Sequence, residues 1–374
     1  MDSTESSSDS LRLLTDISCR IERELETFKD EFQTAPLSAI SSPFREAITS
    51  SIMRGGKRLR PTLFVLSYRG YAPETVPNLY KSAVALELLH DFMLIHDDIV
   101  DRSQFRRSGP ALHAHFGDVL AQHPTARFSG QDMAMIVGDL MYAVGLKRFL
   151  SVEESPERKL RAMECLTTAA VFTACGELKE LLDTLQARDR ATAEGITQTC
   201  LWKTAYYSFV CPFVAGATLA GAAESELSTL MRCALLLGMA FQIRDDVLDL
   251  TGGLPTALEE PEGNDLQEGK ITLPVWYALQ HVGPRDAACL SAVYDGGLQT
   301  PGALAEAQRI VRNSGGVEYA QAEIARQVDE AHRLMESLTM SEAYRRLLSR
   351  YVGQLMAIPE GVSAFGQTLG VGAA

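Results

Sequence analysis

Apolar residues recur at helical spacing along most of the chain, from Ile17 to the region of Leu355. Side chains three or four residues apart lie on one face of an α-helix, so this spacing predicts amphipathic helices that pack through their apolar faces. Short segments rich in glycine, proline and serine separate these stretches, for example residues 70–77 and 151–156. Because no convincing alternation typical of strands is present, the sequence predicts an all-α fold, a single large bundle of roughly ten or more helices.

The two ends of the chain differ from this pattern. Residues 1–10 are rich in serine, mildly acidic and without an apolar anchor, which predicts a disordered tail over residues 1–14. Residues 359–374 end in Gly-Val-Gly-Ala-Ala and are expected to form a frayed C-terminal tail. The folded domain is therefore expected to span residues 15–358.

Composition and charge narrow the class of protein. Hydrophobic residues make up 46% of the 374 residues, which is enough for a sizeable core, and the net charge of −13 would repel nucleic acid and anionic membrane surfaces. The apolar stretch over residues 209–223 is shorter than the ~20 residues of a membrane span. No secretory signal is visible, and the odd number of cysteines without a CxxC pair indicates reduced thiols. We therefore expect a cytoplasmic protein.

Two acidic motifs of the same spacing, DDIVD at residues 97–101 and DDVLD at residues 245–249, carry the main chemical signal. In the first, Asp97 and Asp101 lie one helical turn apart on the same face. Asp245 and Asp249 are related in the same way. A single motif of this kind is most simply a solvated helix face, but two copies in apolar helices favour an enclosed site. Magnesium prefers carboxylate, phosphate and water oxygens, so the motifs predict a magnesium site.

Basic residues lie near both acidic motifs. GGKRLRP at residues 55–61 concentrates three cations after two glycines, and Arg106 and Arg107 follow the first acidic motif. Arginine matches phosphate oxygens, and glycine lets backbone N–H groups come close to them. Each group taken alone is equally well explained as a solvated loop. Lys203 is different because it is the only charge in a long apolar run, and we expect it to face a negative group.

Taken together, these motifs resemble the trans-isoprenyl diphosphate synthase family, which are head-to-tail prenyltransferases. The matching segments are GGKRLRP, LLH before DDIVD, KTAYYSF, FQIRDDVLD and GNDLQEGKITLP, between residues 55 and 274. The resemblance implies an isoprenoid synthase fold, in which the helical bundle surrounds a central cavity. It also implies isopentenyl diphosphate and allylic diphosphate as substrates, and a homodimer.

The resemblance also implies roles for single residues. The groups that would bind the diphosphate of isopentenyl diphosphate are Gly56, Lys57, Arg60, His90 and Arg107. Those that would contact the allylic diphosphate are Arg106, Lys203 and Lys270. The metal ligands for three Mg²⁺ ions would be Asp97, Asp101 and Asp245, supported by Asp246, Asp249 and Asp265. The side chains that would present oxygen atoms to the allylic carbocation are Thr204, Tyr207 and Gln242.

Three departures from the family pattern leave parts of this assignment open. Glu259 and Glu260 stand where a Gly-Lys pair is usual. Residues 176–180, GELKE, resemble the GQxxD motif but carry Glu177 for glutamine and Glu180 for aspartate. The C-terminus also lacks the basic residues that close over the site in some members.

Product length in this family depends on what closes the pocket beyond the first acidic motif. Phe92 and Met93 lie five and four residues before Asp97, about 6–8 Å along the helix. A single aromatic residue at the first of these positions, without an insertion in DDIVD, resembles the synthases that make geranylgeranyl diphosphate, the C20 product. One alternative is that Phe92 is only a core residue, and another is that the product is farnesyl diphosphate. The protein is otherwise a class I terpene cyclase or a non-catalytic modulating subunit.

Overall fold

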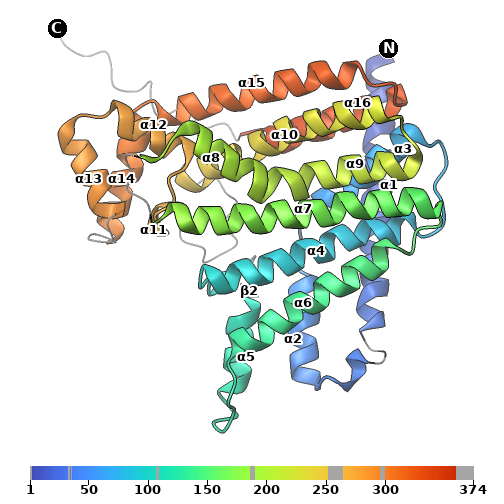
Figure 1. Cartoon of the computed structure of the whole chain (residues 1–374), viewed down its shortest axis with the longest axis horizontal. Helices are drawn as coiled ribbons and strands as arrows, with labels where there is room; N and C mark the ends of the chain where they lie inside the picture. The colour runs from blue at the N-terminus through green and yellow to red at the C-terminus, as the bar shows by residue number, and fades with distance from the viewer. Residues whose placement is uncertain are drawn as a thin grey trace.

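The computed structural model describes residues 2–32, 34, 36–106, 109–185, 190–251, 264–294 and 300–358, with side chains from residue 12 onward (Figure 1). Regular structure in these residues is helical except for a short antiparallel hairpin of β1 (Phe105–Arg106) and β2 (Gly109–Pro110). The predicted all-α fold is confirmed.

The helices, in chain order, are α1 (Asp2–Glu31), η1 (Leu37–Ala39), α2 (Ser42–Ile52), α3 (Leu59–Tyr71), α4 (Leu79–Val100), α5 (Leu112–Leu120), α6 (Gly130–Phe149), α7 (Pro156–Asp183), α8 (Ala193–Cys200), η3 (Leu201–Val210), α9 (Cys211–Ala220), α10 (Glu224–Thr251), α11 (Asn264–Gln267), α12 (Leu273–His281), α13 (Pro284–Tyr294), α14 (Pro301–Asn313), α15 (Gly316–Glu336) and α16 (Glu342–Met356).

The N-terminal segment differs from the prediction of a disordered tail over residues 1–14, because α1 begins at Asp2. The cause lies further along the helix, where Ile17, Ile21 and Leu25 form a buried apolar stripe. Packing of that stripe nucleates the helix, and each residue added to an existing helix costs little free energy, so the helix extends towards the N-terminus. The segment predicted as a C-terminal tail, residues 359–374, lies outside the described residues.

The long helices pack around one core (Figure 1). α4 lies against α6 and α3, α7 lies against η3 and α9, and α10 contacts both η3 and α15. A single cluster of buried apolar side chains extends from Ile17 on α1 to Met356 on α16. The helices that carry the acidic and basic motifs are therefore held by a shared core, which limits how far they can move relative to each other.

The segment η3 is a π-helix of ten residues, a conformation that is rare and often found at functional sites. It is wedged between α7 and α10 at two glycines. A Cβ atom on Gly176 would lie 2.3 Å from the backbone nitrogen of Lys203, and one on Gly238 would lie 2.5 Å from the Cα of Ala205. Larger residues at either position would push η3 away, so these contacts set the position of Lys203.

Among the described residues, α10 is the one helix long and apolar enough to cross a bilayer. Half of its most apolar window is buried inside the protein, and its C-terminal half carries Asp245, Asp246 and Asp249. It also packs against η3, α15 and α9. These are the features of a core helix in a globular domain.

Candidate functional site

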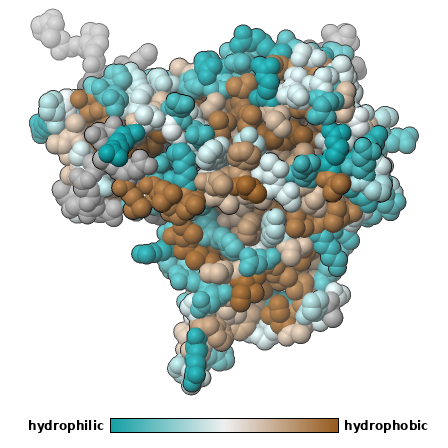
Figure 2. Space-filling view, viewed as in Figure 1, coloured by the Kyte–Doolittle hydropathy of each residue, from teal (hydrophilic) through white to brown (hydrophobic). Residues whose placement is uncertain are grey.

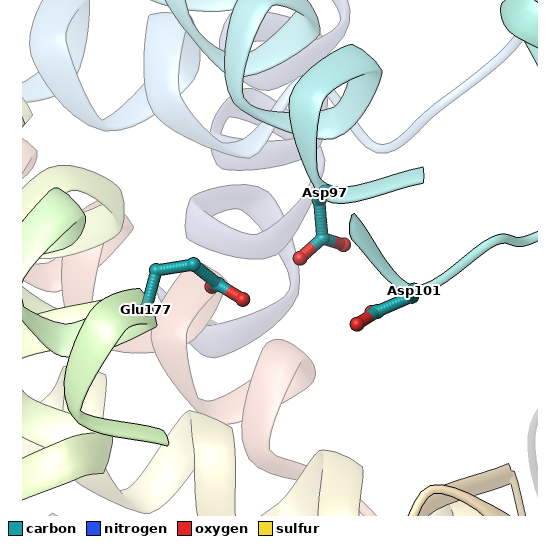
Figure 3. A group of neighbouring side chains, drawn as sticks. All are labelled: Asp97, Asp101 and Glu177. Carbon is teal, nitrogen blue, oxygen red and sulfur yellow. The ribbon is translucent and has the colours of Figure 1, made fainter. Parts of the chain in front are cut away.

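The first acidic motif lies where α4 ends, and it faces α7 (Figure 3). One carboxylate oxygen each from Asp97, Asp101 and Glu177 lie within 4.8 Å of one another. The backbone N–H of Asp101 donates to the Asp97 carbonyl at 2.8 Å, and Arg102 then adopts a left-handed conformation with φ of 58°. The helix therefore stops directly after Asp101, which leaves the Asp101 side chain on the rim of the site.

The second acidic motif lies on α10 and is ordered by hydrogen bonds. Gln242 donates from Nε2 to Asp246 at 2.7 Å and accepts through Oε1 from the Thr204 hydroxyl of η3. Asp249 accepts from the backbone N–H of Asp265 at 3.2 Å, which ties α11 to α10. These hydrogen bonds thus tie η3 and α11 each to α10. Asp245 is paired with Arg244 at 2.9 Å.

Lys203 and Lys270 neutralise part of this negative charge. The ammonium group of Lys203 lies 2.6 Å from Glu180, 2.9 Å from Glu177 and 3.7 Å from Asp97. Lys270 lies 3.4 Å from the same Glu180 and 3.7 Å from Asp101. Glu180 is therefore the carboxylate that both lysines share. The prediction that Lys203 faces a negative group is confirmed.

Arg106 also contacts the first acidic motif. It lies on β1, and its guanidinium pairs with Asp98 at 2.5 Å and with Asp97 at 3.4 Å. Asp98 is buried and was not among the predicted ligands, and its partner explains why a carboxylate is tolerated there. Arg107, predicted to bind substrate, lies outside the described residues, as do Glu259 and Glu260.

The GGKRLRP segment divides into exposed and buried parts. Gly56 and Lys57 are exposed in the loop before α3, whereas Arg58 is buried and pairs with Glu22 at 2.8 Å and Glu87 at 2.9 Å. Arg58 thus anchors the loop to α1 and α4. It adopts a left-handed conformation with φ of 45° at the start of α3, which turns the chain between the loop and the helix.

Arg60 and His90 both lie close to the Tyr207 ring. The buried Arg60 donates to the Ser208 hydroxyl at 2.7 Å, and its guanidinium carbon lies 4.3 Å from the centre of the Tyr207 ring. The His90 ring centre is 6.0 Å from that of Tyr207. Arg60 and Lys57 are also close enough to Asp245 to act on its carboxyl group electrostatically. The tertiary structure therefore brings this segment close to the second acidic motif, which lies far from it along the chain.

Burial makes several of these carboxylates poor at holding a negative charge. It raises the pKa of Asp101 to about 6, with a further contribution from Asp97, and raises the pKa of Asp245 to about 6. Burial likewise raises the pKa of Asp246 to about 7. Burial opposes the charge on Lys203 as well, but Glu180 and Asp97 outweigh it and raise the pKa of that lysine. Carboxylate oxygens are hard ligands, and buried carboxylates that lack a neutralising cation suit a divalent ion such as Mg²⁺.

A cavity of about 710 Å³ opens beside the second acidic motif. Its wall includes Lys203, Gln242, Asp246, Asp265 and Lys270, and it continues along α7 and α8. Four predicted residues of η3, α10 and α11 therefore share one space, namely Lys203, Gln242, Asp246 and Asp265.

The residues predicted to limit product length lie on α4 before Asp97, on the N-terminal side of the first acidic motif. The Phe92 ring packs against His96 at 4.8 Å and against Tyr142 of α6 at 5.0 Å between ring centres. Met93 is half-buried on the same helix. Phe92 is thus held in an aromatic group between α4 and α6.

Sequence reasoning missed several members of the site. Glu177 and Glu180 were noted only as departures from a pattern, and Glu268, which pairs with Lys270 at 2.5 Å, was passed over within a matching motif. Ser208, the partner of Arg60, follows the selected Tyr207 directly. Only Glu177 and Glu180 carried a signal, since acidic residues at helical spacing in a family motif indicate a shared face.

Residues 41–311 match the Polyprenyl synthetase family. The chain belongs to this family. Heptaprenyl diphosphate synthase component 2 of Geobacillus stearothermophilus is 31% identical over 88% of this chain and 95% of that protein. Geranylfarnesyl diphosphate synthase of Aeropyrum pernix is 31% identical over 78% of this chain and 86% of that protein.

The crystal structure of geranylgeranyl pyrophosphate synthase from Corynebacterium glutamicum is 23% identical and superposes with a TM-score of 0.82, covering 91% of this chain and 98% of that chain. It shows that the two proteins share the fold. As a member of the polyprenyl synthetase family, the protein is a prenyltransferase that uses isopentenyl and allylic diphosphates. The family is in general magnesium-dependent.

The raised pKa of Asp101 predicts how the metal-free protein responds to pH. Asp101 binds a proton more tightly in the folded chain than in the unfolded one, so its charge destabilises the fold above pH 6. In a chelator, Asp101→Asn should raise the free energy of unfolding at pH 8 by roughly 1–3 kcal/mol. The gain should shrink as the pH falls through about 6 and disappear below about 4.

Urea unfolding across this pH range measures the effect. In excess Mg²⁺ the order should reverse, because the wild type gains stability by binding the ion. An equal stability difference at pH 4 and pH 8 would contradict the assignment.

Proposed function

We propose that the protein condenses isopentenyl diphosphate with allylic diphosphates, head to tail, to make geranylgeranyl diphosphate in a magnesium-dependent reaction. The observation that carries this proposal is the pair of lysines, Lys203 and Lys270, between the carboxylates of α4 and α7 and those of α10 and α11. Carboxylates and lysines together suit a negatively charged ligand that binds along with metal ions. The free thiols of all seven cysteines support a cytoplasmic location.

The carboxylates would hold three Mg²⁺ ions, with Asp97 and Asp101 on one side and Asp245 on the other. When bound, Mg²⁺ would stabilise the negative charge that develops on the departing pyrophosphate. Asp246, Asp249 and Asp265 would orient this site through the hydrogen bonds that join α10, η3 and α11.

The basic residues would bind the two diphosphates. Lys203, Lys270 and Arg106 now pair with carboxylates of the site, so an allylic diphosphate would exchange with those partners as its metals neutralise them. Arg60 and His90 lie close to Tyr207 and would bind isopentenyl diphosphate, together with the exposed Gly56 and Lys57. Arg107 would act with them.

The reaction would need no protein nucleophile. The allylic C–O bond breaks and its electron pair leaves with pyrophosphate, after which the isopentenyl double bond supplies the electrons of the new C–C bond. The Thr204 hydroxyl donates a hydrogen bond to Gln242, so the lone pairs of the Thr204 oxygen would remain available to the carbocation. Gln242 is in turn held in place by its hydrogen bond to Asp246. The Tyr207 oxygen would add a third dipole. Pyrophosphate accepts the final proton from the isopentenyl unit.

Incubation of the purified protein with isopentenyl diphosphate, farnesyl diphosphate and Mg²⁺ tests this function. Elongation should occur, and Asp97→Asn should lower its rate at least about 100-fold because a group that stabilises the transition state is lost. Asp30→Asn, an exposed charge on α1, is the matched control and should leave the rate unchanged.

Three other outcomes would contradict the proposal in different ways. Release of a cyclic hydrocarbon would indicate a terpene cyclase. Elongation only after addition of a second, different chain would indicate a modulating subunit, and a product that stops at farnesyl diphosphate would move the assignment to a shorter chain length.

The proposed product length rests on Phe92. Its ring packs against those of His96 and Tyr142, and this aromatic group would close the space between α4 and α6 beyond Asp97. Met93 lies next to it on the face nearer the aspartates. The relatives named above make products of different lengths, so the length has to be argued from the pocket of this chain.

Replacing Phe92 tests the pocket directly. Phe92→Ala removes the ring and should shift the main product beyond C20, whereas Phe92→Leu fills most of the same volume and should keep C20 as the main product. Chromatography of the dephosphorylated products distinguishes the two. An unchanged product from Phe92→Ala would exclude Phe92 as the residue that limits chain length.

We further propose that the active form is a homodimer that pairs through α6 and α7. Large apolar side chains are exposed on both helices, including Ile136 at 68%, Val171 at 63% and Leu178 at 58%. Figure 2 shows hydrophobic residues gathered over the face on which α4, α6 and α7 lie. An exposed apolar patch of this kind supports a protein interface, and a second copy would offer a matching apolar patch.

Sedimentation of a charged variant tests the dimer. Ile136→Glu should shift the protein towards the monomer and weaken association at least about tenfold, because a carboxylate would be buried at the interface. Met231→Glu, an exposed apolar position on α10, should leave association unchanged. A monomeric wild type would refute the proposal.

A further inference from the structure

Glu177 stands at the position where the GQxxD pattern has a neutral glutamine, and its carboxylate belongs to the first acidic group. We propose that Glu177 is a third protein ligand of the magnesium site formed by Asp97 and Asp101. The added charge lets a divalent cation bind there before any diphosphate arrives. This inference rests on the proposed function only for the identity of the metal.

The geometry suits a shared ion. Oxygen ligands of Mg²⁺ lie about 2.1 Å from the metal, so two of them are separated by about 4.2 Å at most. The oxygens of Asp97, Asp101 and Glu177 already lie within 4.8 Å of one another. Figure 3 shows the three carboxylates approaching one space from α4 and α7. Small side-chain rotations would bring all three into the shell of one cation.

The two oxygens of Glu177 have different surroundings. Oε2 accepts from Lys203 at 2.9 Å, whereas Oε1 is buried without a hydrogen-bond partner among the described residues. A buried carboxylate oxygen without a partner is unfavourable, and a bound cation would satisfy it. The preceding residue, Gly176, touches the backbone of Lys203, so Glu177 cannot move far from the site.

Lys203 does not need Glu177 in order to remain neutralised. Its shorter contact, 2.6 Å, is with Glu180, which also pairs with Lys270. Glu180 can therefore hold both lysines while Glu177 turns to a metal ion. The two acidic residues of GELKE thus divide the work: Glu180 positions the lysines, and Glu177 binds the cation.

Binding of Mn²⁺, which replaces Mg²⁺ and is visible by electron paramagnetic resonance, tests the proposal without any diphosphate. The wild type should bind Mn²⁺ under these conditions, and Mg²⁺ should displace it. Glu177→Gln should weaken this binding about tenfold or more, because one charged ligand is lost. Glu177→Asp keeps the negative charge but shortens the side chain by one methylene group. If Glu177→Asp loses as much Mn²⁺ affinity as Glu177→Gln, Glu177 coordinates the ion directly and does not act only by long-range attraction.

Glu164→Gln, an exposed charge on the same helix, is the matched control and should bind Mn²⁺ like the wild type. Equal Mn²⁺ affinity of Glu177→Gln and the wild type, or no binding by the wild type without diphosphate, would overturn the proposal. The measurement does not depend on turnover. If the variants show the predicted order of Mn²⁺ affinities but the protein does not elongate its substrates, the proposed function is refuted and the assignment of Glu177 as a ligand still holds.

Discussion

Lys203 and Lys270 lie among five carboxylates, those of Asp97, Asp101, Glu177, Glu180 and Glu268. Both lysines pair with Glu180, and each reaches one aspartate of the first acidic motif. Charges brought together in a partly buried space attract more strongly than in water, but only if each finds a partner. Burial and the neighbouring Asp97 raise the pKa of Asp101 although Lys270 and Lys203 act to lower it, so the lysines do not fully offset the cost of this charge. The remaining negative charge is what makes the site fit divalent cations.

The backbone that carries these groups is shaped for close contact. Gly176 and Gly238 let the π-helix η3 lie directly against α7 and α10. This brings Lys203 to the carboxylates of α7, and it brings Thr204 to Gln242 of α10. The two acidic motifs are therefore coupled through one short segment rather than through their own helices. A shift of η3 would alter both sides of the site together.

Membership of the polyprenyl synthetase family accounts for the shared machinery but not for product length. The relatives include a heptaprenyl and a geranylfarnesyl diphosphate synthase, at similar identity to this chain. The proposed product length depends on the space beyond the first acidic motif, where Phe92 packs against Tyr142 of α6. The same helix α6 carries the exposed Ile136, so the helix that packs against Phe92 is also part of the proposed dimer face.

The amino-acid sequence by itself determined the all-α class, the two aspartate motifs and the basic residues near them, because helical periodicity and residue spacing are local properties. It also indicated that Lys203 faces negative charge. Its prediction for the N-terminus failed, since packing of Ile17 and Ile21 elsewhere on α1 stabilises the helix from Asp2. Only the tertiary structure decided that Arg58 anchors its loop through Glu87, that Arg106 pairs with Asp98, and that Glu177 joins the aspartates. Arg58 and Glu87, and Glu177 and the aspartates, lie far apart along the chain, and Arg106 reaches Asp98 only because the chain turns after α4. Helix packing and chain turns set these distances, and no local pattern records them.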